Sequence, residues 1–163
     1  MAELTIFGTV LLLVGAVCLC KNVFFKYDRM LQSYGELLRL LYNLRQKIST
    51  SALSPDKILD SDEGFDLLVA SGFIACARER GLCVAFEKTE KLLLMEGEDK
   101  DMLHKYFSGF GGYMLNAELE NLSMVIDSLE KKHMQIKSDI PSKKKVASTV
   151  IVCCTLMVII LII

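Results

Sequence analysis

Apolar residues are concentrated at the two ends of the chain, whereas apolar and polar residues are mixed along the middle. Residues 4–20 and residues 146–163 contain no Asp, Glu, Lys or Arg and are rich in Leu, Val and Ile. The second stretch has 18 residues. A helix of that length spans about 27 Å, close to the hydrocarbon core of a membrane at about 30 Å. The pattern predicts two transmembrane anchors, at residues 4–25 and 143–163.

A cleaved signal peptide is the alternative interpretation of the first apolar stretch. Signal peptides carry basic residues before the apolar run and a small-x-small cleavage site after it. Here Met-Ala-Glu comes before the run and Lys21 follows it, which favours a retained anchor. The basic residues that flank both stretches lie on the side of the middle region, so the positive-inside rule places a helical domain of residues 26–142 in the cytoplasm. These flanking residues are Lys21, Lys26, Arg29, Lys137, Lys143, Lys144 and Lys145.

Two long parts of the middle region carry apolar residues at intervals of three and four, which is typical of amphipathic helices. Helices that leave and re-enter one membrane face run in opposite directions, so we expect these two stripes to pack against each other in antiparallel orientation. A coiled coil with another protein is the alternative, because it would give the same pattern. The helix-packing stripe comprises Tyr27, Tyr34, Leu41 and Ile48 in the first part and Leu115, Leu122, Leu129 and Ile136 in the second.

Shorter helices are predicted between these two parts, because Ser, Pro and Gly residues separate short helical patterns. The segment FSGFGGY is expected to form the turn before the last long helix, through Gly109, Gly111 and Gly112. No segment alternates with period two, so we expect an all-α fold with five to six cytoplasmic helices. The short helices are predicted at Ser54–Leu59, from Ser61 to Arg78–Arg80 with Gly81 as its stop, at Val84–Met95 with a Glu87–Lys91 pair, and at Glu98–Phe107.

Charge and cysteine content argue against several classes of function. The chain has 19 Lys and Arg residues and 20 Asp and Glu residues, with a net charge of −1. Nucleic acid is therefore not an expected partner, since phosphate binding needs a net basic face. The six Cys residues include no C-x-x-C pair, which gives no support for a zinc or thioredoxin-like site. Cys76 and Cys83, in the predicted cytoplasmic domain, are expected to be reduced.

No catalytic constellation is recognisable, and we expect neither an enzyme nor a bound cofactor or metal. The two His residues are His104, three positions after Asp101, and His133, which lies on an apolar stripe. A His–Asp pair needs a nucleophile or a metal in order to act, and the neighbouring sequence supplies none. A membrane-tethered interaction module is the favoured interpretation. A membrane-bound enzyme subunit that uses His104 is kept as a further hypothesis.

The layout of the chain and two short motifs resemble the stage III sporulation protein AB family. The segment ISTSALSPDKIL, residues 48–59, is similar to the family's polar turn before a short helix. The segment FSGFGGYMLNAELENL, residues 107–122, resembles the family's F-G-x-x-L-G signature. Phe107 and Gly112 match this signature, and Gly111 stands in place of the usual Leu. The Asp and Gln that follow in the family are absent here.

The resemblance implies a membrane protein of the mother cell in a spore-forming bacterium, within the assembly that joins mother cell and forespore. It also implies a helical domain similar to the platform proteins of type II secretion and type IV pilus machines. The expected partners are then the secretion-type ATPase named stage III sporulation protein AA, other components of the sporulation channel complex, and membrane lipid. An oligomeric pore-forming or holin-like protein is the alternative function. Partner-facing residues are expected far from the membrane, at Asp56, Asp62, Glu63, Lys100 and Lys105.

Overall fold

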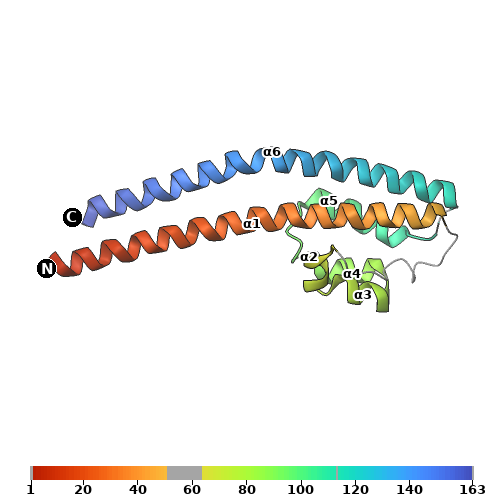
Figure 1. Ribbon diagram of the computed structural model, residues 1–163, viewed down its shortest axis with the longest axis horizontal. Helices are drawn as coiled ribbons and strands as arrows, with labels where there is room; N and C mark the ends of the chain where they lie inside the picture. The colour runs from red at the N-terminus through yellow and green to blue at the C-terminus, as the bar shows by residue number, and fades with distance from the viewer. Residues whose placement is uncertain (1, 51–63, 113, 163) are drawn as a thin grey trace. The chain divides into compact units, whose positions relative to one another are not determined.

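The computed structural model describes residues 2–50, 64–112 and 114–162, with side chains over 7–50, 64–112 and 114–160. The all-α prediction is confirmed for these residues, which contain helices and turns but no strand (Figure 1). The predicted helix at Ser54–Leu59 lies outside the described residues, as do Asp56, Asp62 and Glu63. The helices are α1 (Ala2–Thr50), α2 (Asp66–Ala70), α3 (Phe73–Arg80), α4 (Leu82–Thr89), α5 (Gly97–Gly109) and α6 (Leu115–Ile162).

The chain divides into two compact units, and the first of them contains its apolar ends, Met1–Asp28 and Ile136–Ile163. Among the described residues, the helix from Phe7 to Thr50 is long and apolar enough to cross a membrane. Its most apolar window has a mean hydropathy of 2.0 and is 0% buried. The second predicted anchor, at residues 143–163, stays a prediction. Between the two ends lies a groove of about 410 Å³, whose apolar lining includes Leu13, Val17, Phe24, Val152 and Leu156.

One ion pair joins the two segments of the first unit. The Nζ atom of Lys144 lies 2.6 Å from Oδ1 of Asp28, and it lies 5.4 Å from the centre of the Phe24 ring. Lys144 is the middle of the three consecutive lysines that precede the apolar end of α6. The pair therefore holds the start of one apolar segment beside the end of the other.

The second unit, Arg29–Gln135, has a core of its own. The Tyr42 hydroxyl on α1 donates a hydrogen bond to Oε1 of Glu130 on α6 at 3.0 Å. A Cβ atom at Gly35 would lie 3.7 Å from Nε2 of His133. Residue numbers thus rise along α1 as they fall along α6, so the two helices are antiparallel within this unit. Helix α3 packs against α2 and α4, and α4 packs against α5. The largest fully buried side chains are Tyr34, Leu37, Leu40, Leu41, Leu44, Leu68, Phe73, Phe86, Leu93, Leu103, Leu122 and Ile126.

The predicted helix-packing stripe is most deeply buried at its centre. Tyr27 and Ile48, near the ends of its first part, are half-buried, and Leu115 at the beginning of α6 is 52% exposed. Leu115 therefore lies at the surface rather than in the core. The other members of the stripe, Tyr34, Leu41, Leu122, Leu129 and Ile136, are all buried.

One predicted helix is divided in two. A single helix was predicted from Ser61 to Arg78–Arg80, but α2 and α3 are separated at Gly72, whose φ is +78°. A left-handed residue of this kind ends an α-helix, and glycine adopts it at little cost. The predicted stop is confirmed, because α3 ends at Arg80 and Gly81 follows with a φ of +88°.

The helix predicted at Val84–Met95 is wrong at its end, because α4 ends at Thr89 and turns follow. Leu93 and Met95 are both buried, with 0% and 7% of their surfaces exposed. Residues two positions apart on an α-helix point about 200° away from each other. A helix continued along the surface could not bury both side chains, whereas the turns place both in the core.

The glycine cluster lies between α5 and α6. Gly109 is the last residue of α5, and Gly111 has a φ of +79°. The Gly112 N–H donates to the Gly109 carbonyl at 3.1 Å, and a Cβ atom at Gly112 would lie 3.3 Å from that oxygen. The positive φ and the close approach both favour glycine in this turn.

Candidate functional site

A buried tyrosine of α1 holds the N-terminus of α5. The Tyr34 hydroxyl donates to Oδ2 of Asp99 at 2.5 Å and accepts the N–H of Glu96 at 3.2 Å. Burial raises the pKa of Tyr34, and its hydrogen bond to Asp99 raises it further. Lys132 of α6 reaches the same place, with its Nζ 2.6 Å from Oε2 of Glu96. Helices α1, α5 and α6 are therefore joined at one end of α5.

A buried carboxylate of α1 caps α2. Glu36, with 7% of its surface exposed, accepts the N–H groups of Leu67 and Leu68 at 2.9 Å and 2.8 Å. The Gln32 amide donates to the same carboxylate at 2.8 Å. The residue before α2 is Phe65, which has no side chain able to cap a helix. The orphan N–H groups of α2 are thus satisfied by another helix, and the negative charge lies at the favourable end of its dipole.

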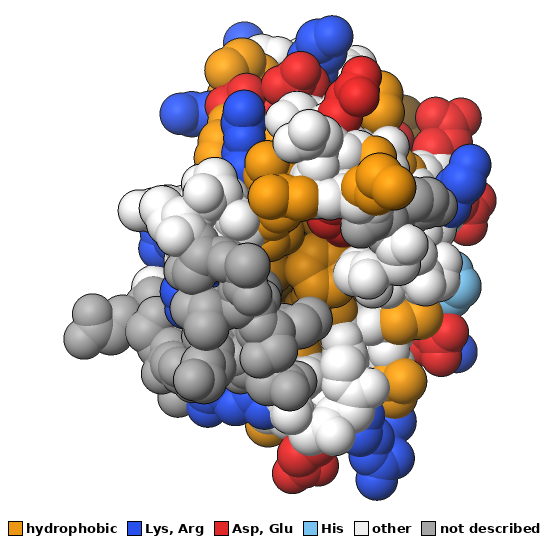
Figure 2. Space-filling model, turned by 90° about the vertical axis from the view of Figure 1, so that its right-hand side faces the viewer, with side chains coloured by type: hydrophobic (Ala, Val, Ile, Leu, Met, Phe, Trp, Pro, Cys, Tyr) orange, Lys and Arg blue, Asp and Glu red, His pale blue; other side chains and the backbone are white. Residues whose placement is uncertain are grey.

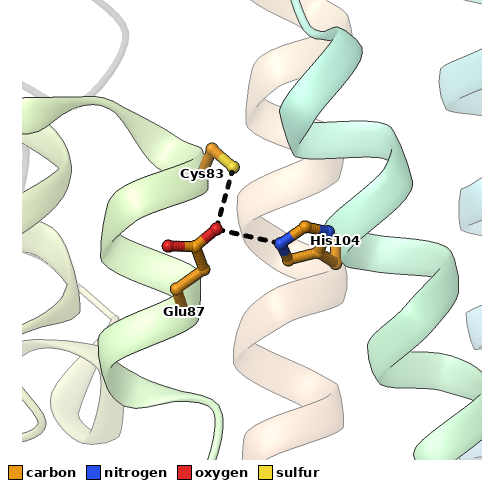
Figure 3. Close-up of side chains that lie close together, drawn as sticks. All are labelled: Cys83, Glu87 and His104. Atoms are coloured by element: carbon orange, nitrogen blue, oxygen red, sulfur yellow. Dashed lines mark hydrogen bonds and ion pairs between the residues drawn. The ribbon is translucent and has the colours of Figure 1, made fainter.

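Three side chains converge between α4 and α5 (Figure 3). They offer a sulfur, an oxygen and a nitrogen atom that could each bind a metal ion. Nε2 of His104 lies 3.0 Å from Oε1 of Glu87, and the Cys83 thiol donates to the same oxygen at 3.8 Å. One ligand atom from each residue lies within 4.8 Å of the other two. His104 and Glu87 are 46% and 53% exposed. Burial raises the pKa of the Cys83 thiol, and the neighbouring negative charge of Glu87 raises it further.

These three residues were not predicted to lie together. His104 was predicted to lie on one helix face with Asp101, and Glu87 was predicted to pair with Lys91. Lys91 lies in the turns after α4, so the predicted helical pair does not form and Glu87 contacts His104 instead. The available signal was the spacing of Cys83 and Glu87, which are four positions apart and therefore adjacent on one helix face.

A shallow groove of about 450 Å³ lies between α5 and α6. It contains Lys105, one of the residues expected to face a partner, whereas Lys100 is half-buried outside the lining. Hydrophobic side chains also gather in a hollow on the face of the molecule shown in Figure 2. Met114 at 87% and Met124 at 58% are among the most exposed hydrophobic residues of the described chain. The lining of the groove comprises Met102, Lys105, Tyr106, Asn121, Met124 and Val125.

Two buried polar groups lie at this groove, and one of them, Tyr106, is part of its lining. Tyr106 and Glu118 are 8% and 5% exposed. Neither the Tyr106 hydroxyl nor the Glu118 carboxylate makes a hydrogen bond of acceptable geometry within the described part of the chain. The two groups are nevertheless close enough to interact. Burial raises the pKa of Tyr106, and the negative charge of Glu118 raises it further. Polar groups left in this state are costly, so the wall of the groove carries an energetic cost within the described part of this unit.

The C-terminal part of the chain, from α3 to the end of α6, matches a known protein family. The family model described as stage III sporulation protein AB matches residues 74–163, which is more than half of the chain. The chain belongs to the stage III sporulation protein AB family. The match covers most of α3 and all of α4, α5 and α6, so it includes both the groove and the Cys83, Glu87 and His104 cluster. No curated protein sequence and no solved structure matches the chain.

Proposed function

We propose that this protein is a membrane-anchored platform in a secretion-like sporulation complex between mother cell and forespore. In this proposal its helical unit, Arg29–Gln135, docks the cytoplasmic secretion-type ATPase named stage III sporulation protein AA, and it performs no catalysis itself. The observation that carries the proposal is the separation of the chain into a unit of apolar helical ends and a helical unit with its own core. Membership of the sporulation family sets its context.

The exposed surface of the first unit supports the membrane anchor. Phe7, Met157 and Ile160 are 71%, 66% and 74% exposed. Large apolar side chains exposed to this extent are unfavourable in water and favourable in lipid. The lysines at positions 143–145 lie where the second anchor would meet the cytoplasmic face, as the positive-inside rule expects. The mother-cell membrane is the proposed location.

The groove between α5 and α6 is the proposed docking surface for the ATPase. Met102 and Met124 line it, and methionine side chains adapt well to the surface of a partner. Lys105 adds a positive charge at its edge, which suits an acidic rim on the partner. The groove lies inside the region that the family model matches, as expected of a surface used by the family.

Binding of the purified ATPase to the full-length protein in detergent tests this function. Met124→Lys should weaken binding at least tenfold, because it places a charge in the apolar lining of the groove. The matched control is Met134→Lys, at an equally exposed methionine of the same helix outside the groove, with 62% against 58% exposure. This control should bind like the wild type. Lack of binding by the wild type would contradict the platform function, and equal weakening by both variants would contradict the docking surface.

A further inference from the structure

We propose that Cys83, Glu87 and His104 form a binding site for a divalent transition-metal ion, of which Zn²⁺ fits the donor set best. The three side chains offer a thiolate, a carboxylate oxygen and an imidazole nitrogen, all within 4.8 Å of one another. Figure 3 shows the thiol and carboxylate of α4 directed toward the imidazole of α5. The site is separate from the proposed docking groove, and neither proposal depends on the other.

The donor spacing is close to what a tetrahedral ion needs. Zinc binds sulfur at about 2.3 Å and nitrogen or oxygen at about 2.0–2.1 Å, so tetrahedral angles place donors about 3.3–3.6 Å apart. The observed 3.0 Å between Glu87 and His104 and 3.8 Å between Cys83 and Glu87 lie on either side of that range. The third separation, between Cys83 and His104, is within 4.8 Å, and rotation of the exposed Glu87 and His104 side chains would bring each donor to its own bonding distance from one ion.

The backbone that carries the three residues is held by the core. Cys83 and Glu87 are one helical turn apart on α4. Phe86, which lies between them and is fully buried, packs against Phe107 of α5 with ring centres 5.5 Å apart. The separation between the two ligands of α4 and the ligand of α5 is therefore set by aromatic packing, and the exposed side of the cluster leaves a fourth position for water.

The mixture of donors selects the class of ion. Mg²⁺ and Ca²⁺ take oxygen ligands almost exclusively, so a thiol and an imidazole do not suit them. Zinc accepts sulfur, nitrogen and oxygen together. Without a metal the neutral Cys83 thiol keeps its proton and donates a hydrogen bond to Glu87. When Zn²⁺ binds, the S–H bond breaks, a Zn–S bond forms, and the proton passes to the buffer. No oxidation or reduction is involved.

Metal titration of the full-length protein in detergent tests the site, with ZnCl₂ alone and a chromogenic chelator as competitor. One Zn²⁺ should bind per chain in competition with the chelator. Co²⁺ in its place should show the near-ultraviolet band of a thiolate-bound cobalt ion. Cys83→Ser should abolish this band, and Glu87→Gln and His104→Gln should each weaken Zn²⁺ binding at least tenfold. The control Cys76→Ser, at a half-buried cysteine of α3, should keep both properties.

Folding and the remaining cysteines are controlled in the same experiment. Zn²⁺ should raise the unfolding temperature of the wild type and of Cys76→Ser but not that of Cys83→Ser, because the ion joins α4 to α5 in the folded state alone. Circular dichroism checks that each variant is helical. The proposal is overturned if the cobalt band persists in Cys83→Ser, if all variants bind Zn²⁺ equally, or if the wild type does not bind it in competition with the chelator.

Discussion

The hydroxyl of Tyr34 on α1 donates a hydrogen bond to the carboxylate of Asp99 on α5, across 65 positions of the chain. Asp99 is 8% exposed and Tyr34 is fully buried. The same hydroxyl accepts the N–H of Glu96 at the N-terminus of α5. One side chain thus joins the first long helix to the helix that carries His104, and it sets where α5 begins.

Removal of this hydroxyl should destabilise the helical unit. Tyr34→Phe leaves the buried Asp99 carboxylate without its partner, and we expect a loss of about 1.5–3 kcal/mol in the free energy of unfolding. Tyr42→Phe is the matched control, because its hydroxyl bonds to Glu130 at an exposed site and should contribute less than about 1 kcal/mol. Urea unfolding of the full-length protein in detergent measures both. Equal losses would contradict the role assigned to Tyr34.

The cap that α1 supplies to α2 makes a second prediction. Glu36→Ala removes the acceptor for the Leu67 and Leu68 N–H groups, so both amides should exchange with solvent faster and the unit should lose about 1–2 kcal/mol of stability. Hydrogen exchange read by mass spectrometry reports the change at α2. The exposed Glu120→Ala on α6 should stay within about 0.5 kcal/mol of the wild type. Unchanged exchange at α2 in Glu36→Ala would refute the cap.

Gly72, which separates α2 from α3, should be required because of its backbone conformation, and not because a larger side chain would clash. A Cβ atom at Gly72 would meet nothing within 4 Å, but the φ of this residue is +78°. Gly72→Ala should therefore cost about 1–2 kcal/mol of stability. Gly97→Ala, which also meets open space and lies in the first turn of α5, should be neutral or slightly stabilising. Thermal unfolding separates the two, and a neutral Gly72→Ala would contradict the left-handed break.

The reactivity of Cys83 should show its raised pKa. Burial, and then the charge of Glu87, favours the neutral thiol, so less thiolate is present at pH 8 and alkylation should be slower than for an unperturbed thiol. The rate should climb as the pH rises through the elevated pKa. Glu87→Gln removes the charge but not the burial, so its rate profile should move only part of the way toward lower pH. Mass spectrometry of peptides alkylated at a series of pH values measures this, and identical profiles for the two proteins would be the contrary result.

The proposed two-anchor arrangement predicts which parts of the chain cross the membrane. Alkaline phosphatase, which is active only outside the cytoplasm, should be inactive when fused after Gly112 and active when fused after Ile163. The first fusion lies in the proposed cytoplasmic unit and the second follows the proposed C-terminal anchor. Activity of the first fusion, or inactivity of the second at equal expression, would contradict the proposed topology.

Local patterns were enough to predict most of the helices. The apolar stripe of α1 was predicted to end near Ile48, and α1 is helical through Thr50, the last described residue before position 64. Helix α5 was predicted at Glu98–Phe107 and runs from Gly97 to Gly109. Gly81 marked the end of α3. These features follow from periodicity, and from a glycine that needs no partner elsewhere in the chain, so nearby residues suffice to reveal them. The second family motif, residues 107–122, was local in the same sense and lies inside the family match, whereas the first, residues 48–59, lies outside that match and stays a prediction.

The other features depend on contacts between distant residues. A glycine inside a helical pattern is often tolerated, so nothing near Gly72 distinguished a break from a continuous helix. The end of α4 follows from the burial of both Leu93 and Met95, which requires a core formed by other helices. Glu36 and Leu67 are 31 positions apart, and Glu87 and His104 are 17 apart. Such pairs depend on helix packing, because contacts such as Phe86 on Phe107 hold the two backbones at the separation that lets the polar groups meet.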